Sequence, residues 1–305
     1  MTLRTIKFST FADGTDAVLH LHEIKGTKGD GPTVGISAAI HGDEPTGTRI
    51  AMEIARTYRD GGFRGRMLIL PVANPIGFQK SRRHTPLDDV NLNRVFPGDP
   101  AGWYSDRLAH VITTEFLTKV EVLFDLHAGG HKPTVDYIYI RTAEDLSRAF
   151  GSPILYRAHV GLPGTVFTGT TSTVIEDRGG KVVTVELGGG LVDQEEYVRR
   201  GVVGIDNMLK TLGMVDGAPV PPPPQTVCSG ITTLRFGMGG IVFNEAPPLG
   251  QRVKEGAVIG RIVSPYTFEE LEVIRNPVAD GVMILAHLTP NIVEPGDYAY
   301  MIGHP

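Results

Sequence analysis

Four mainly apolar runs in the first two thirds of the chain constrain its fold more than any other feature. They occupy residues 32–40, 67–72, 120–126 and 181–187. Runs without strict alternation are typical of strands buried on both faces, as in a parallel sheet covered by helices. Polar residues stand at or just beyond their ends, namely His41, Asn74, His127 and Glu186. Because the carboxyl ends of parallel strands share one edge, where α/β proteins bind ligands, we expect these side chains to meet there.

The intervening segments predict a hairpin, covering helices and a long loop. The hairpin is expected at residues 5–11 and 17–24, a further strand at 136–141, and helices near 45–58, 105–119, 143–150 and 193–212. The segment Gly77–Pro100 is rich in Arg, Asp and Asn and lacks periodicity, which is typical of a structured loop that serves function. The Gly- and Thr-rich segment Gly161–Thr173 is also expected to form loops.

The composition changes beyond a proline-rich segment. Residues 217–224 read GAPVPPPP, which indicates a stiff linker. From Ile231 onward the runs are short, β-rich and divided by Gly and Pro, and two halves resemble each other weakly. The pattern resembles a biotinyl/lipoyl-type barrel sandwich, but no lysine stands at its midpoint, 268–271, so we exclude a carrier role. The sequence thus predicts a catalytic α/β domain at 1–215, a linker at 216–226 and a β-barrel-like domain at 227–305.

Charge and cysteine content narrow the classes of partner and compartment. The chain has 305 residues and a net charge of −5, which favours neither nucleic acid nor an anionic membrane as partner. The single cysteine, Cys228, excludes an intramolecular disulfide framework and fits a reducing compartment. No apolar run reaches the roughly 18 residues that a membrane span requires. We expect a cytoplasmic protein, and the sequence leaves homo-oligomerisation open.

The strand-to-helix corner Ser37–Gly47 carries half of a metal site. His41 ends an apolar run, and Glu44 follows three residues later, where a helix is expected to begin. Imidazole and carboxylate are ligands that suit zinc, and His127 is the candidate third ligand. Two histidines and one glutamate leave a position open for water, which is typical of a catalytic zinc site. Asp125 is expected at most to support a ligand.

Hydrolysis at such a site requires further groups. Glu186 is the candidate to move a proton from water to the leaving group. Arg82 or Arg83 can face a developing oxyanion. The neighbouring pair Asn93–Arg94 offers an amide and a planar guanidinium fork that can hold a carboxylate.

Five segments together resemble one family. The segments are HGDE at 41–44, NP at 74–75, NLNRVFPG at 91–98, DLHAGG at 125–130 and VELGGG at 185–190. They look like the succinylglutamate desuccinylase/aspartoacylase family, which is related to the zinc carboxypeptidases. The resemblance implies a zinc carboxypeptidase-like mixed sheet with covering helices, and a second β-rich domain. It extends over most of residues 30–190.

The resemblance also implies the roles of individual residues. His41, Glu44 and His127 would bind one zinc ion per chain, and Glu186 would act as general base and acid. Asn93 and Arg94 would bind the substrate carboxylate, while Arg83 would contact the scissile carbonyl. The adjacent Arg82 keeps that last assignment open.

The resulting expectation is a zinc-dependent amide hydrolase that removes a short acyl group from a small N-acyl amino acid. The segment 85–98, TPLDDVNLNRVFPG, is similar to the branch that deacetylates N-acetyl-2,4-diaminobutyrate during ectoine breakdown. A metallocarboxypeptidase acting on a peptide C-terminus is the second enzyme hypothesis. A metal-bearing protein that binds a small ligand is the non-enzymatic one. No residue pattern reveals which acyl group or amino acid is used.

Overall fold

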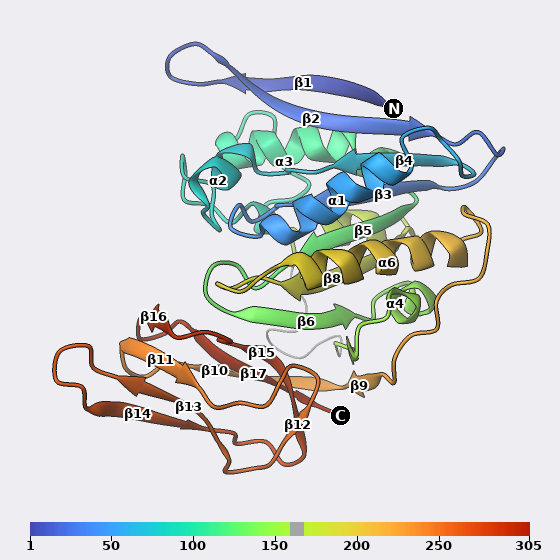
Figure 1. The fold of residues 1–305 in the computed structure, drawn as a ribbon. Coiled ribbons are helices and arrows are strands. Elements are labelled where there is room, and N and C mark those ends of the chain that lie inside the picture. The colour runs from blue at the N-terminus through green and yellow to red at the C-terminus, as the bar shows by residue number, and fades with distance from the viewer. Residues whose placement is uncertain (159–167) are drawn as a thin grey trace.

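The structure is a computed structural model that describes residues 1–158 and 168–305. Within these residues, a 13-stranded mixed sheet forms the centre of the protein (Figure 1). Its main path runs β1-β2-β4-β3-β5-β8-β6-β15-β17-β10. The strands from the first part of the chain are β1 (Thr2–Thr10), β2 (Asp16–Lys25), β3 (Thr33–Ala38), β4 (Arg66–Leu70), β5 (Val122–His127), β6 (Thr134–Tyr139), β7 (Ile154–Tyr156) and β8 (Lys181–Gly188). Of the loop expected at 161–173, residues 161–167 lie outside the described residues, and residues 171–173 form the first turn of a short helix, α5 (Thr171–Glu176), instead of a loop.

The four apolar runs form adjacent parallel strands. They become β3, β4, β5 and β8, and the parallel pairs are β4–β3, β3–β5 and β5–β8. β6 then continues the sheet antiparallel to β8. The hairpin predicted near the N-terminus is β1–β2, whose second strand pairs with β4. The parallel order places the ends of β3, β5 and β8 side by side, as the sequence predicted.

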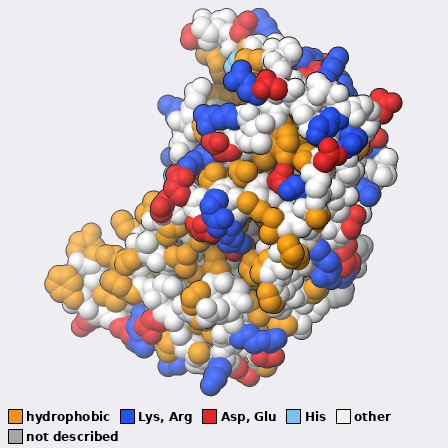
Figure 2. Space-filling view, turned by 45° about the vertical axis from the view of Figure 1, so that its right-hand side comes forward, with side chains coloured by type: hydrophobic (Ala, Val, Ile, Leu, Met, Phe, Trp, Pro, Cys, Tyr) orange, Lys and Arg blue, Asp and Glu red, His pale blue; other side chains and the backbone are white. Residues whose placement is uncertain are grey.

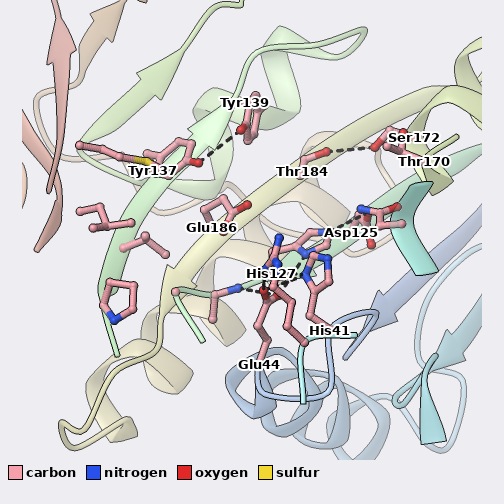
Figure 3. Close-up of a pocket in the computed structure, with 18 of the residues that line it drawn as sticks. His41, Glu44, Asp125, His127, Tyr137, Tyr139, Thr170, Ser172, Thr184 and Glu186 are labelled. Carbon is pink, nitrogen blue, oxygen red and sulfur yellow. Dashed lines mark hydrogen bonds and ion pairs between the residues drawn. The ribbon is translucent and has the colours of Figure 1, made fainter. Parts of the chain in front are cut away.

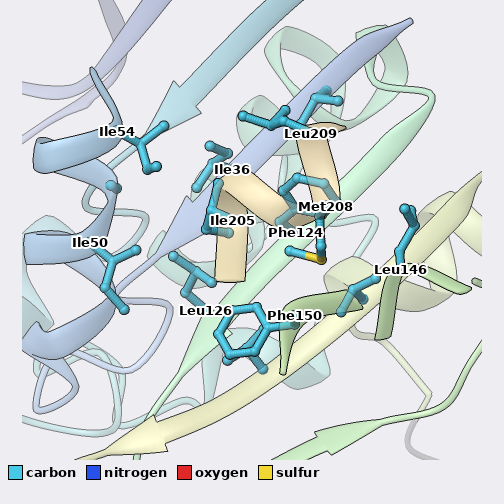
Figure 4. Packing of buried hydrophobic residues seen from close by; sticks show 14 of the residues in the cluster. Ile36, Ile50, Ile54, Phe124, Leu126, Leu146, Phe150, Ile205, Met208 and Leu209 are labelled. Carbon is cyan, nitrogen blue, oxygen red and sulfur yellow. The ribbon is translucent and has the colours of Figure 1, made fainter. Parts of the chain in front are cut away.

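Helices cover both faces of this part of the sheet. They are α1 (Pro45–Thr57), α2 (Pro75–Lys80), α3 (Tyr104–Glu115), α4 (Glu144–Phe150), α5 (Thr171–Glu176) and α6 (Glu195–Thr211), with 3-10 turns η1 (Leu92–Arg94) and η2 (Leu117–Lys119). One buried apolar cluster joins α1, α4 and α6 to the sheet. Figure 4 shows Ile50 of α1, Ile205 of α6 and Phe124 of β5 as members of this cluster. A second cluster joins α3 and α5 to the opposite face. Among the described residues, none of the helices combines the length and apolarity that crossing a bilayer requires.

The C-terminal strands build a second sheet and also extend the first. They are β9 (Thr226–Cys228), β10 (Gly230–Arg235), β11 (Gly240–Asn244), β12 (Arg252–Val253), β13 (Val258–Val263), β14 (Glu270–Arg275), β15 (Gly281–Ala286), β16 (Asn291–Val293) and β17 (Tyr298–His304). The smaller antiparallel sheet has the order β14-β13-β11-β16. A third apolar core contains residues of both sheets, among them Ile262 of β13 and Ile302 of β17. The fold class is therefore the predicted one, a mixed α/β fold with a small β-rich C-terminal part.

The α/β part and the C-terminal part are joined by strand pairing as well as by the linker. β15 pairs directly with β6, with Leu285 opposite Val135 and Ala286 opposite Thr134. The proline-rich segment is itself held, because the buried Asn207 side chain accepts a hydrogen bond from the Val220 amide at 2.8 Å. Strand pairing between segments so distant in sequence leaves no local pattern, so the sequence could not indicate it.

The surface seen in Figure 2 differs between the larger α/β part and the C-terminal part. Acidic and basic side chains are interspersed over the larger part, whereas hydrophobic side chains gather toward the end formed by the smaller sheet. The most exposed of these in the C-terminal part are Tyr266 at 91%, Phe268 at 81% and Ile292 at 70%. None of these three residues belongs to the apolar core that contains residues of both sheets.

Candidate functional site

Three predicted ligands meet where β3 and β5 end. His41 follows β3, Glu44 immediately precedes α1, and His127 is the last residue of β5. One ligand atom from each lies within 4.8 Å of the others, and all three residues are buried. The Nδ1 atoms of His41 and His127 lie 2.8 and 3.0 Å from the two carboxylate oxygens of Glu44 (Figure 3).

The outer nitrogens of both histidines are engaged elsewhere. His41 Nε2 lies 3.2 Å from Asn91 Oδ1, and His127 Nε2 lies 3.2 Å from Asp125 Oδ2. The buried Asp125 also accepts a hydrogen bond from Thr171 Oγ1 at 2.6 Å. These contacts orient the two rings so that their Nδ1 atoms face the glutamate, which is how outer partners orient metal-ligating histidines. Asn91 was not singled out by the sequence analysis, although it belongs to the NLNR segment.

The electrostatics of this cluster suit a cation. Burial alone would raise the pKa of Glu44, but His41 and His127 beside it hold that pKa well below its usual range. The glutamate therefore stays ionised at a fully buried position. A buried carboxylate facing two imidazole nitrogens is a donor set that fits zinc. The residues present thus fit the metal that the sequence predicted.

Glu186 lies beside the cluster. In the register of the sheet it stands opposite His127 on β5 and opposite Tyr137 on β6. Burial raises the pKa of Glu186 to about 8, although the positive charge of His127 acts in the other direction. Its carboxylate faces the same cavity as the three ligands. It therefore lies beside the candidate metal site and outside the ligand set found among the described residues.

The two adjacent arginines of the long loop take different positions. Arg83 Nη1 donates to Glu44 Oε1 at 3.0 Å and lies 3.3 Å from His41 Nδ1. Arg82 instead lines neighbouring hollows, and its carbonyl accepts the Gly42 amide at 2.9 Å. The geometry thus places Arg83, rather than Arg82, beside the candidate metal ligands.

The Asn93–Arg94 pair also lines the cavity. Asn93 Oδ1 accepts the Thr171 amide at 3.1 Å, which fixes the side chain of this buried residue. Arg94 Nη1 donates to the Asn93 carbonyl at 2.6 Å. All seven residues that the family resemblance assigns as ligands, base or substrate contacts therefore line one cavity of about 180 Å³, whereas the alternative Arg82 does not line it.

The residues of the opposite wall of this cavity were not among those predicted from the sequence. β6 contributes Val135, Tyr137 and Tyr139, whose two-residue spacing puts them on one strand face. The C-terminal part contributes Leu285, Tyr298 and Met301. The alternation in β6 was a usable signal. The C-terminal residues gave none, because only the pairing of β15 with β6 brings them to the site.

The chain is similar to known proteins in both sequence and structure. The model of the succinylglutamate desuccinylase/aspartoacylase catalytic domain matches residues 30–212. The N-alpha-acetyl-L-2,4-diaminobutyric acid deacetylase of Halomonas elongata is 33% identical over 211 residues, which are 65% of this chain and 60% of that protein. The match thus spans less than two thirds of this curated relative.

Solved structures show the same architecture over nearly the whole chain. A succinylglutamate desuccinylase from Silicibacter sp. TM1040 superposes with a TM-score of 0.83 at 26% identity, covering 99% of this chain and 94% of that one. The product-bound ectoine utilization protein EutE (DoeB) of Ruegeria pomeroyi gives a TM-score of 0.85 at 24% identity, with the same coverage of both chains, and shows likeness of fold alone. Since the catalytic-domain model matches more than half of the chain, the protein belongs to the succinylglutamate desuccinylase/aspartoacylase family.

Proposed function

We propose that the protein is a zinc-dependent amide hydrolase that removes a short acyl group from an N-acyl amino acid. The observation that carries this proposal is the buried cluster of His41, Glu44 and His127, which opens on a cavity that also contains Glu186 and Arg83. The proposal is also supported by the names of the relatives, which include a deacetylase of an acetylated amino acid and a desuccinylase.

The three ligands and Glu186 would divide the chemistry. His41, Glu44 and His127 would hold one zinc ion, which when bound polarises a carbonyl and lowers the pKa of water. Glu186 takes a proton from the attacking water and delivers it to the leaving amine. A carboxyl group with a pKa near the working pH is suited to both transfers, and burial moves Glu186 in that direction.

The arginines and Asn93 would bind and orient the substrate. Arg83 lies next to the ligand cluster, where its charge can stabilise negative charge that develops on the carbonyl oxygen. Asn93 and Arg94 hold the carboxylate of the amino acid, as an amide beside a guanidinium fork can do. We propose a small N-acyl amino acid as the partner, a cytoplasmic location, and no binding to nucleic acid or membrane.

The position of the C-terminal part favours this function over the alternatives. A carboxypeptidase needs an open cleft for a peptide, whereas Leu285, Tyr298 and Met301 close one side of the cavity. A small substrate is therefore favoured over a peptide. In a protein that only binds a ligand, a partly buried carboxyl group with a raised pKa beside the proposed metal ligands would have no proton to transfer.

Metal analysis combined with a substrate panel tests the proposal. We expect about one zinc per chain in the purified protein, and hydrolysis of at least one member of a panel of N-acetyl, N-formyl and N-succinyl amino acids. His41→Ala should lose both zinc and activity, whereas His20→Ala, at an exposed position of β2, should keep both. Wild-type protein without metal, or full metal content in His41→Ala, would contradict the proposed ligand set.

A further inference from the structure

The floor of the cavity follows the register between β8 and β6. Thr184 pairs with Tyr139, Glu186 with Tyr137, and Gly188 with Val135. Two residues along a strand span about 6.7 Å, so the first and third of these rows lie about 13 Å apart. Directly paired residues share one face of a sheet, and Glu186 stands in the middle row. The cavity therefore has two ends on either side of the proposed base.

One end is rich in hydroxyl groups. Tyr139 and Thr184 lie there with Ser172, whose Oγ is 3.2 Å from Thr184 Oγ1 (Figure 3). The neighbouring Thr171 amide donates to Asn93 Oδ1, which places the Asn93–Arg94 pair at the same end. A carboxylate is thus expected to bind on this side of Glu186.

The other end is apolar and comes from three strands. Val135 of β6 pairs with Leu285 of β15, and Leu285 pairs with Met301 of β17. All three residues line the cavity. Val135 and Leu285 are each 3% exposed. These three paired residues extend the cavity wall from β6 of the catalytic part to β15 and β17 of the C-terminal part.

A β-bulge turns Leu285 toward this end. In a regular strand Met283 and Leu285 would share a face, but the register with β17 shifts between them. Met283 accordingly packs in the core between the two sheets, whereas Leu285 packs with Val135. Bulges commonly re-aim a side chain beside an active site. The apolar end thus depends on a specific irregularity of the strand.

The shape of the substrate assigns a role to the apolar end. In an N-acyl amino acid the carboxylate and the acyl chain extend from the amide in opposite directions. With the carboxylate at Asn93–Arg94 and the amide beside Glu186, the acyl chain extends toward Val135, Leu285 and Met301. We propose that these three residues form an acyl subsite that selects a short uncharged acyl group, acetyl or propionyl, over succinyl. This inference rests on the proposed function.

Electrostatics give the reason for the selectivity. The far carboxylate of a succinyl group would enter an aliphatic environment, where an ionised group without a partner is strongly disfavoured. Three cations line the adjoining hollow: Arg82, Arg83 and Lys132. Arg83 is paired with Glu44 at 3.0 Å and Lys132 with Asp297 at 2.6 Å, while Arg82 lines that hollow together with the acidic Asp43 and does not line the cavity that the acyl chain enters. Each methylene of an aliphatic acyl group gains instead from burial, until the subsite is full.

Kinetics with an acyl series provide the first test. For zinc-loaded full-length protein and one amino acid, we expect kcat/KM for the acetyl or propionyl substrate to exceed that for succinyl on the order of 100-fold. Met301→Lys should shrink this ratio at least about tenfold, because its ammonium can pair with the succinyl carboxylate. Met301→Ala should shift the preference toward butyryl. Met238→Lys, at a half-exposed position outside the cavity, is the matched control.

Binding separates this inference from the proposed function. Calorimetry on Glu186→Gln should show tighter binding of the acetyl than of the succinyl compound, and Met301→Lys in that background should narrow the difference. Binding in this order without hydrolysis by the wild type would support the subsite and refute the proposed reaction. Hydrolysis that favours succinyl, or a ratio unchanged in both Met301 variants, would overturn the subsite. Absence of binding by every compound would overturn both.

Discussion

Glu186 has a raised pKa that suits proton transfer but makes its contribution to stability depend on pH. Its carboxyl group is placed where burial raises the pKa to about 8, against a usual value of 4.5. A folded-state pKa above the unfolded value means that folding favours the neutral acid. The group therefore contributes stability below about pH 4.5, and that contribution is lost as the pH rises toward 8.

The first prediction concerns Glu186→Gln in two states of the protein. In zinc-loaded protein the variant should keep its metal and lose about 10²–10⁴-fold in hydrolysis, because the amide cannot accept the proton. In metal-free protein it should be more stable than the wild type at pH 8.5, and this difference should shrink toward pH 5. Thermal unfolding at both pH values and elemental analysis measure these effects. Loss of zinc along with activity would instead identify Glu186 as a ligand.

At the scale of residues, the sequence predicted correctly those site residues that stand at the ends of parallel strands. His41, His127 and Glu186 could be placed together because a parallel sheet aligns the ends of its strands. Leu285 and Met301 could not, since a bulge and a pairing between distant segments bring them to the cavity. Both are common apolar side chains, so only their position in the cavity indicates that they can contact a substrate.

At the scale of elements, the long loop after β4 depends on one buried asparagine. Asn74 Oδ1 accepts the Gly77 amide at 3.0 Å and so caps α2, while its Nδ2 donates to Thr85 Oγ1 at 3.0 Å. Asn74 thus fixes both ends of the segment that carries Arg83. The sequence predicted that Asn74 would meet His41, His127 and Glu186, but Asn74 is not among the residues that line their cavity, and its contacts hold the backbone and the loop instead. The short helices α2 and α5 and the strand β7 were not predicted, because none of them is long enough to show a period.

The second prediction follows from this capping contact. Asn74→Ala should lower the free energy of unfolding by about 1–3 kcal/mol, because it removes a cap and leaves buried partners unsatisfied. It should also reduce turnover, since Arg83 would no longer be held beside Glu44. Denaturant unfolding and steady-state kinetics measure the two effects. Asn244→Ala, which alters a turn in the smaller sheet, is the control and should change neither by a comparable amount. An Asn74→Ala variant that is destabilised but turns over normally would show that the loop is held by other contacts.

At the scale of the whole molecule, the large sheet joins the two parts that the sequence treated as separate domains. β15 and β17 continue the sheet beyond β6, and β9 pairs with β7. Lys132 and Asp297 form an ion pair across the same junction. A chain ending at Val220 would expose the edge of β6 and uncover Val135. Exposed edges with apolar neighbours invite aggregation.

The last prediction is that the protein unfolds as one cooperative unit. Calorimetry of the full chain should show a single transition, and the chain ending at Val220 should fail to give a soluble protein with a cooperative transition. The control is the double variant Tyr266→Ser, Phe268→Ser, which changes two highly exposed residues of the C-terminal part and should leave the transition in place. Two resolved transitions, or a truncated chain that folds and binds zinc normally, would show that residues 1–215 form an autonomous domain. The acyl subsite would then be closed by a separable domain, and substrate selectivity should vanish in the truncated protein while zinc binding persists.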